Sequence, residues 1–176
     1  MLVLIYIVFI FGGVLLLFAS LKPSTFRVVR RESMRAPAEK IFALVNDLAA
    51  WNDWYPSLKS DSGMGKNFSR VTVGKGAGYQ WDSEGEAGAG ELEITDSVPP
   101  TRVELSFEMI EPYQAHYLFD FRIEAMDGYT TVTWAIAGKR EMKAKVKSIF
   151  TGFDEEEGVE LEEGLDNLKR LCEKRK

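Results

Sequence analysis

Cysteine and histidine are nearly absent from this sequence. Its 176 residues include one cysteine, Cys172, and one histidine, His116. A disulfide framework, a zinc ribbon and a multi-histidine metal centre therefore lack the residues to build them. A hydrolase with a catalytic histidine would have to use His116. We expect no metal and no cofactor.

An excess of positive charge is also missing. The formal net charge is −5, so no basic face of the kind that binds nucleic acid is expected. Hydrophobic residues make up 45% of the chain and aromatic residues 12%, enough to build a core. The length fits one ordinary domain with a short appendage.

Residues 1–21 contain no charged residue. As a helix they would extend over roughly 30 Å, the thickness of a hydrocarbon core, so they are predicted to form a single transmembrane helix. A cleaved signal peptide is the alternative. It would need a positive residue before the apolar run and a small-x-small cleavage site, and Phe18-Ala19-Ser20 fits such a site poorly.

Basic residues flank the apolar segment on its C-terminal side only. They are Lys22, Arg27, Arg30, Arg31 and Arg35. The positive-inside rule then places the rest of the chain in the cytoplasm. We therefore predict a transmembrane helix at 1–21, a linker at 22–25 and a folded domain at 26–176, on the cytoplasmic side of the membrane.

The remaining sequence alternates between strand and helix patterns. Pro37 fits the first turn of a helix whose apolar face runs to Leu48, and a second short helix precedes Pro56. Residues 57–68 are predicted to form a loop. Strands are predicted at 26–33, 68–73, 78–83, 90–95, 101–109, 115–124 and 131–136.

The C-terminal part, after Gly138, is predicted to be helical, with a bend or break near residues 151–158. The order of strand, short helices, about six strands and a long last helix indicates an α+β domain. Its helices are expected on one face of an antiparallel sheet.

Three stretches resemble the SRPBCC superfamily, which includes START-like lipid-transfer proteins and polyketide cyclase/dehydrase-like proteins. They are residues 36–54, residues 95–103, and residues 131–138 together with 163–169. The resemblance spans about residues 26–174. It implies a helix-grip fold, in which a curved antiparallel sheet wraps around the long C-terminal helix and leaves an apolar cavity between them. The fold alone does not define an activity.

Inward-facing aromatic residues form the main candidate site. Alternation places seven of them on the sheet face toward the last helix, with Phe150, Met142 and Ile149 opposite: Tyr79, Trp81, Phe107, Tyr117, Phe119, Phe121 and Trp134. They either line a cavity for an apolar ligand or simply fill a closed core. Buried hydroxyls of Tyr79 and Tyr117 would need a partner, which a ligand could supply.

The other motifs give weaker evidence of function than the aromatic residues. His116 is predicted to face outward, and the glycine-rich residues 74–78 lack the following helix of a dinucleotide site. The acidic run 154–157, with Glu160, Glu162 and Glu163, is interpreted as a solvated helix start. Basic residues at 27, 30, 31, 139, 140, 143, 145 and 147 either contact anionic lipid headgroups or form an ordinary soluble face.

Together these features predict a membrane-tethered domain that binds or transfers a hydrophobic small molecule such as a lipid, quinone or polyketide-like molecule. A cyclase or dehydratase acting on such a ligand is one alternative, although no catalytic residue can be assigned. Tyr79 or Tyr117 would have to serve as acid or base. The other alternative is a ligand-free interaction domain whose own aromatic side chains fill the interior.

Overall fold

The computed structural model describes five stretches of the chain, 23–56, 65–83, 88–111, 114–139 and 153–174, and a few residues nearer the N-terminus. The latter are Tyr6, Ile10, Gly12–Val14, Leu17, Ser20 and Leu21. Most of the predicted transmembrane segment and all of residues 140–152, which include four of the predicted basic residues, therefore lie outside the described residues.

A seven-stranded antiparallel sheet, counted over the described stretches, forms the body of the domain in the order β1-β7-β6-β5-β4-β3-β2. The strands are β1 (Thr25–Met34), β2 (Gly65–Phe68), β3 (Gly78–Asp82), β4 (Ala89–Val98), β5 (Arg102–Glu111), β6 (Ala115–Met126) and β7 (Tyr129–Lys139). All but the first follow one another as neighbours, because hairpins connect them. β1 then pairs with β7 at the other edge.

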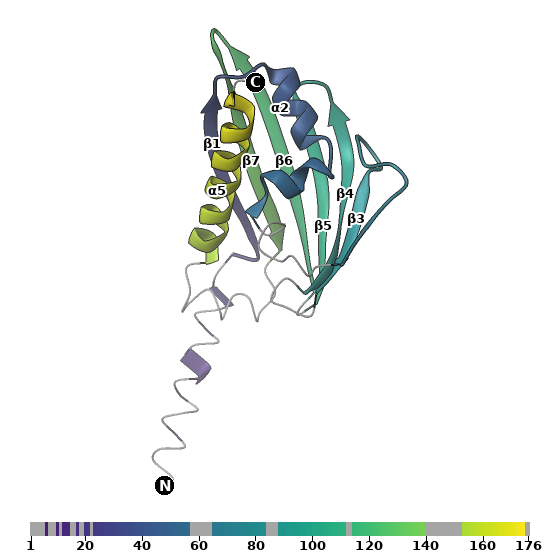
Figure 1. The fold of residues 1–176 in the computed structure, drawn as a ribbon. Helices are drawn as coiled ribbons and strands as arrows, with labels where there is room; N and C mark the ends of the chain where they lie inside the picture. Colours follow the sequence, from purple (N-terminus) through teal and green to yellow (C-terminus); the bar gives the residue numbers. More distant parts are fainter. Residues whose placement is uncertain are drawn as a thin grey trace.

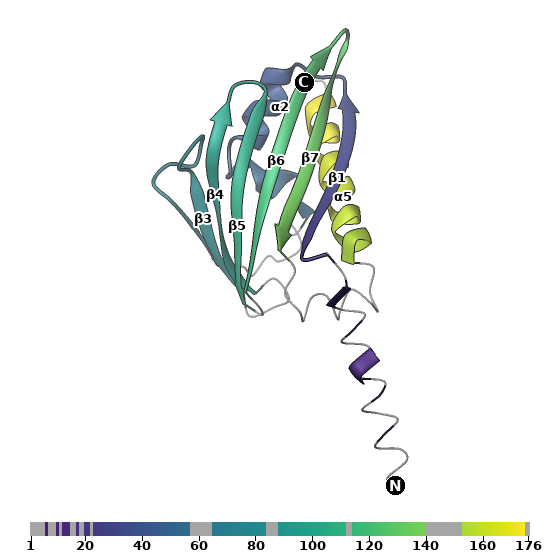
Figure 2. The ribbon, with the colours of Figure 1, turned by 180° about the vertical axis from the view of Figure 1, so that it is seen from behind.

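The helices α2 (Ala38–Val45), η1 (Ala50–Asp53) and α5 (Phe153–Glu173) cover one face of this sheet (Figure 1). The view from behind shows strands alone in front of them (Figure 2). α5 contacts β1, whereas α2 contacts β5 and β6. The α+β class with helices on one face of a curved antiparallel sheet is thus confirmed. We call the helix-bearing face of the sheet the inner face.

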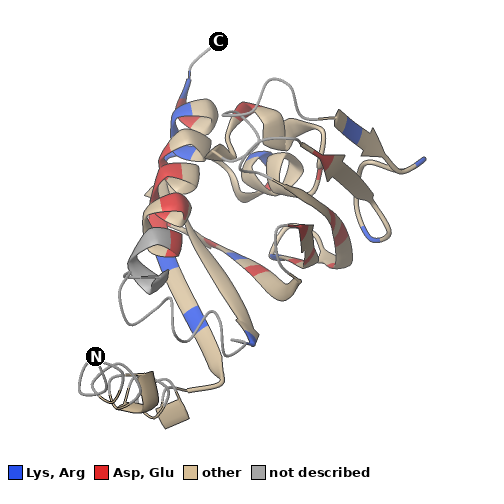
Figure 3. Ribbon diagram, turned by 90° about the horizontal axis from the view of Figure 1, so that it is seen from below, with Lys and Arg blue, Asp and Glu red and all other residues tan. Residues whose placement is uncertain are grey.

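Two kinds of contact hold α5 against β1. Leu161, Leu165 and Leu168 turn inward and are buried. Outside this stripe, Arg30 Nε lies 2.5 Å from Glu162 Oε1, and Lys169 Nζ lies 2.5 Å from Glu32 Oε1. Figure 3 shows charged residues of both signs along α5. Because these pairs are partly exposed, burial of the leucines contributes more to docking.

The predicted strand 68–73 is wrong, as is the predicted loop at 65–68. The sheet strand here is β2, which ends at Phe68. The β-branched run that follows pairs elsewhere: Leu48 N donates to the Thr72 carbonyl over 3.0 Å, and Val73 bridges Asp47. A β-branched run therefore formed extended backbone here, but its hydrogen bonds go to the segment after α2.

The N-terminal segment is helical at its described positions, where Ser20 Oγ donates to the Leu17 carbonyl over 2.7 Å. Its described apolar side chains are exposed, and the short piece at Gly12–Val14 projects beyond the end of the domain (Figure 1). Among the described residues, no helix has both the length and the apolar character needed to cross a bilayer.

Candidate functional site

Five of the predicted aromatic residues form a continuous wall on the inner face. The ring of Trp81 lies 5.8 Å from Tyr79 and 5.2 Å from Phe107, measured between centroids. Phe107 in turn stacks on Tyr117 and Phe119 at 5.8 Å and 5.4 Å. We call Tyr79, Trp81, Phe107, Tyr117 and Phe119 the aromatic wall. Its residues come from β3, β5 and β6, so side chains of three strands form one surface.

Two glycines of the sheet allow rings of the aromatic wall to lie flat. A Cβ on Gly138 would stand 2.5 Å from Cδ1 of Tyr117, and one on Gly90 would stand 2.6 Å from Cη2 of Trp81. Both separations are shorter than a van der Waals contact. The absence of a side chain at each glycine thus sets how closely the neighbouring ring approaches the strand.

Burial falls along the inner face from one end of the sheet to the other. On β5, Val103 and Leu105 are fully buried, but Phe107 and Met109, which follow on the same face, are only partly buried. On β6, exposure likewise rises from Phe121 toward Ala115. The inner face is therefore closely packed at one end and more open at the other.

The packed end is an aromatic cluster under α2. Phe121 and Trp134 are fully buried and stack at 4.7 Å between ring centroids. Trp51 and Trp54, from η1 and the residue after it, pack at 4.8 Å from each other and contact both of these rings. Phe121 and Trp134 are thus core residues beside the aromatic wall, of which only Phe107 is partly buried and the other four rings are buried. Phe150, Met142 and Ile149 lie outside the described residues.

Two buried indole groups in this cluster have no acceptor in the described part of the chain. Trp51 Nε1 donates to the Val45 carbonyl over 2.9 Å. Trp54 Nε1 and Trp134 Nε1 make no hydrogen bond there, although both side chains are fully buried. Such an N–H group is costly to leave unpaired, by about 1–3 kcal/mol. Alternation alone gave no sign of these two donors, because it indicates burial but not pairing.

A tyrosine that the sequence did not single out lies beside them. The Tyr55 ring is 6.1 Å from Trp54 and 5.7 Å from Trp134, and its hydroxyl lies within the electrostatic influence of the Glu160 carboxylate on α5. Burial, reinforced by Glu160 and by Glu157, raises the pKa of Tyr55 well above its ordinary value. Burial also raises the pKa of Tyr79.

The sequence predicted that the acidic residues at the start of α5 are solvated. In the structure they are not all so. Glu157 and Glu160 are half-buried and act on a buried tyrosine. They flank the leucine stripe of α5, one turn apart, so both lie on the edge of the helix nearest the interior. Negative charge is thus present beside the aromatic cluster.

His116 faces outward, as predicted. It is exposed on β6, and its Nε2 lies 3.0 Å from Ser106 Oγ on the neighbouring strand. A pocket of about 760 Å3 lies at this end of the sheet, lined mainly by outer-face residues that include Ile110 and Leu118. The described His/Cys/Asp/Glu residues include no cluster of three or more suited to a metal ion.

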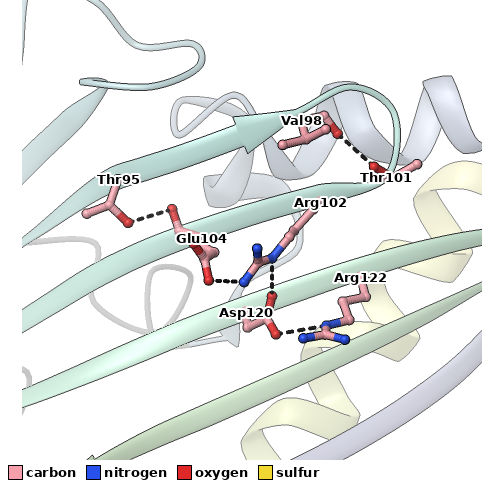
Figure 4. Close-up of polar contacts among 7 residues, drawn as sticks. All are labelled: Thr95, Val98, Thr101, Arg102, Glu104, Asp120 and Arg122. Carbon is pink, nitrogen blue, oxygen red and sulfur yellow. Dashed lines mark hydrogen bonds and ion pairs between the residues drawn. The ribbon is translucent and has the colours of Figure 1, made fainter.

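Charged residues of the outer face neutralise one another (Figure 4). Asp120 accepts from Arg102 Nε over 3.1 Å and from Arg122 Nε over 3.0 Å, and Arg102 also contacts Glu104. On β1, Arg30 faces α5, where it pairs with Glu162, whereas Arg27 and Arg31 of the same predicted basic set are exposed. The strand alternation that separates it from its neighbours explains the difference.

Comparison with known proteins agrees with this architecture. A family model described as polyketide cyclase / dehydrase and lipid transport matches residues 25–173. No curated protein matches the chain. Among solved structures, the Aha1 dimer from Colwellia psychrerythraea is 16% identical, with a TM-score of 0.59 over 84% of this chain and 96% of that one. Protein MLL2253 from Mesorhizobium loti is 11% identical, with a TM-score of 0.61 over 83% and 96%.

A third structure, the di-domain ARO/CYC protein BexL from the BE-7585A biosynthetic pathway, is 13% identical, with a TM-score of 0.62 over 90% of this chain and 53% of that one. At these identities the likeness shows the fold alone. The fold and the inner aromatic wall define a domain of the helix-grip class. With the family model covering nearly the whole domain, the chain belongs to the polyketide cyclase / dehydrase and lipid transport family.

Proposed function

We propose that this domain binds or transfers a hydrophobic small molecule on the aromatic wall of its inner face. The observation that carries the proposal is the fall in burial along β5. Phe107 and Met109 point to the same side as the buried Val103 and Leu105, yet are only partly covered in the described structure. Partly covered apolar groups on a concave face are where an apolar ligand gains most from leaving water.

The chemistry of the wall favours a planar or extended apolar ligand. Phe107 stacks on two neighbouring rings with interplanar angles of 4° and 11°. A flat surface of this kind offers a large contact area at little cost in side-chain entropy, because aromatic side chains have few rotatable bonds. Quinones, polyketide-like molecules and lipid chains all fit this description.

We also propose that residues 1–21 tether the domain to a membrane, with the domain on the cytoplasmic side. The support is the uncharged sequence and the one-sided basic flank. The exposed apolar side chains at Tyr6, Ile10 and Leu17 agree with a segment that contacts something other than the domain. A tether of this kind would raise the effective concentration of a bilayer-soluble ligand at the site.

Native mass spectrometry of the full chain extracted from its own membrane tests the proposal by revealing a co-purifying small molecule. Phe107→Ala should reduce its retention, because the change removes the central ring of the wall. Leu118→Ala is the matched control, since Leu118 lies on the outer face of the neighbouring strand. Equal retention by both variants would contradict the proposed location. A chain that retains nothing and shows no saturable tryptophan response to apolar probes would favour the interaction-domain alternative.

A second candidate function is catalysis on the bound molecule, as in a cyclase or dehydratase. The observation that favours it is Tyr55, a buried hydroxyl beside the aromatic cluster whose pKa is raised by burial and by the Glu160 carboxylate. Such a hydroxyl could move a proton to or from a ligand carbonyl. Conversion of an identified ligand by the wild-type chain, lost in Tyr55→Phe while binding persists, would support this candidate.

A further inference from the structure

The end of the sheet at which β1 begins is also the open end of the inner face. Strand pairing places Thr25 of β1 opposite Lys139 of β7. It also places Met109 of β5 opposite Ala115 of β6. The two pairs lie at the same end of the sheet, because the start of β6 pairs with the end of β7. Phe107 and Met109, the partly covered residues of β5, are therefore close to the point where the chain enters the domain.

Phe26, the second residue of β1, joins the aromatic wall to this end. Its ring lies 5.2 Å from that of Tyr117, edge to face, measured between centroids. Gly138 leaves room for both rings, since a Cβ on it would stand 3.1 Å from Cε1 of Phe26 and 2.5 Å from Cδ1 of Tyr117. Ring contacts thus lead without a break from Phe26 through Tyr117 to Phe107 at the centre of the wall.

The pocket of about 760 Å3 opens at the same end. Its lining includes Ile110 and Leu118 of the outer face. It also includes Phe26 and Met109, which strand alternation places on the inner face. Ile110 is apolar and yet 53% exposed. Apolar groups of both faces therefore border accessible space at this end.

The proposed tether would hold this end against the lipid. Thr25 follows Leu21 by four residues, which can span at most about 14 Å. Figure 1 shows the described N-terminal residues beyond this end of the sheet. The 12 residues of β6, at about 3.4 Å each, place Met126 roughly 37 Å from Ala115. If Leu21 is in the bilayer, the start of β1 must stay near the lipid surface, whereas the far end of β6 need not.

We infer that the domain rests on the bilayer by this end, and that its ligand passes between the lipid and the aromatic wall without crossing water. The inference rests on the proposed function, since it assumes both the tether and a ligand on the inner face. Lys139 is accompanied here by the exposed Glu108 and Glu111, so the described charges do not select an anionic lipid. The partner is the bilayer surface itself. A direct route spares an apolar molecule the transfer into water.

Quenching by spin-labelled lipid tests where the domain rests. Ile110→Cys and Met126→Cys, each combined with Cys172→Ala, are labelled with bimane in phosphatidylcholine nanodiscs that contain a doxyl lipid. Met126 is the matched control, because it is also apolar and 58% exposed but lies at the far end of β6. We expect the label at residue 110 to lose emission and the label at residue 126 to keep it. Equal quenching, or stronger quenching at residue 126, would overturn the inference.

The rate of loading tests the route. Decylubiquinone is mixed rapidly with phosphatidylcholine vesicles that carry the full chain, and its arrival in the domain is followed as a loss of tryptophan fluorescence. Inserting about twenty glycine and serine residues after Pro23 keeps the tether and the binding site but frees the end of the sheet. Contact then falls roughly as the −3/2 power of linker length, so loading should be about tenfold slower with the same final loss of fluorescence. An unchanged rate would overturn the direct route.

The two measurements separate this inference from the proposed function. If the quinone lowers fluorescence saturably but the label at residue 110 is not quenched, ligand binding stands and the inference has failed. If residue 110 is in lipid and the quinone does not bind, the docking part stands and the proposed ligand binding has failed. If the full chain does not sediment with the vesicles, the proposed tether has failed and the inference fails with it.

Discussion

The indole ring of Trp134 on β7 lies directly against the backbone of Gly164 on α5. A Cβ at residue 164 would stand 2.8 Å from Cζ3 of Trp134 and 3.5 Å from Cδ of Pro56. The glycine therefore sets how close α5 comes to the sheet, and through it how close Glu160 comes to Tyr55. Trp134 is held by Phe121, Trp51 and Trp54, so it has little room to yield.

Gly164→Ala should destabilise the domain by about 1–3 kcal/mol, the usual cost of overpacking a core. Helix propensity acts in the opposite direction and would favour alanine by about 1 kcal/mol. Gly158→Ala is the control on the same helix, because the added methyl meets only the movable guanidinium of Arg30. We expect Gly158→Ala to stay within about 1 kcal/mol of wild type in urea unfolding. Equal effects of the two changes would contradict the close contact.

Phe121→Ala should cost about 3–5 kcal/mol in free energy of unfolding, because Phe121 is fully buried. Phe107→Ala should cost less, about 1–2 kcal/mol, because that ring is only partly buried at the open end of the inner face. Chemical denaturation of both variants measures the difference. Losses of the same size would mean that the aromatic wall is part of a closed core, as the interaction-domain alternative requires.

Cys172 should resist modification in the folded domain. Its side chain is 3% exposed, and burial raises the pKa of the thiol from 9.0 to about 11. At pH 8 a disulfide reagent such as DTNB should therefore react slowly with the native chain and rapidly once urea unfolds it. Rapid reaction of the native chain would show that the end of α5 opens readily.

The same shift predicts an alkaline loss of stability. Because the folded pKa is raised, the unfolded chain releases the thiol proton first, from about pH 9. The stability contributed by the neutral thiol is complete below that pH and is lost as the pH rises to about 11. Cys172→Ala should show a shallower decline over this range. The tyrosine hydroxyls with raised pKa, Tyr55 and Tyr79, remain in both chains and provide the shared background.

The predicted membrane topology makes a separate prediction. In sealed right-side-out vesicles the domain should be protected from added protease, and in inverted vesicles it should be digested, because the basic flank is retained on the inner side. A variant that begins at Pro23 should no longer sediment with membranes. The opposite protection pattern would contradict the orientation, and sedimentation of the shortened chain would contradict the tether.

Local patterns were enough to predict most of the sheet. On β5, Val103 and Leu105 alternate with Arg102 and Glu104, and this alternation predicted which side is buried. The Asp127-Gly128 pair between β6 and β7 is likewise typical of a tight hairpin turn, and Gly128 has the positive φ of 85° that such a turn requires. These features depend on residues close together in the chain, so the sequence contains their cause.

What the tertiary structure decided depends on which distant segments meet. The run at 70–73 has a strand-like sequence, yet its partner is the segment after α2, and no local signal names that partner. The charge pattern of α5 likewise does not show that Glu160 reaches Tyr55, more than a hundred residues earlier in the chain. Alternation and helical spacing specify the faces of an element, but the residues opposite those faces are set by how the elements pack together.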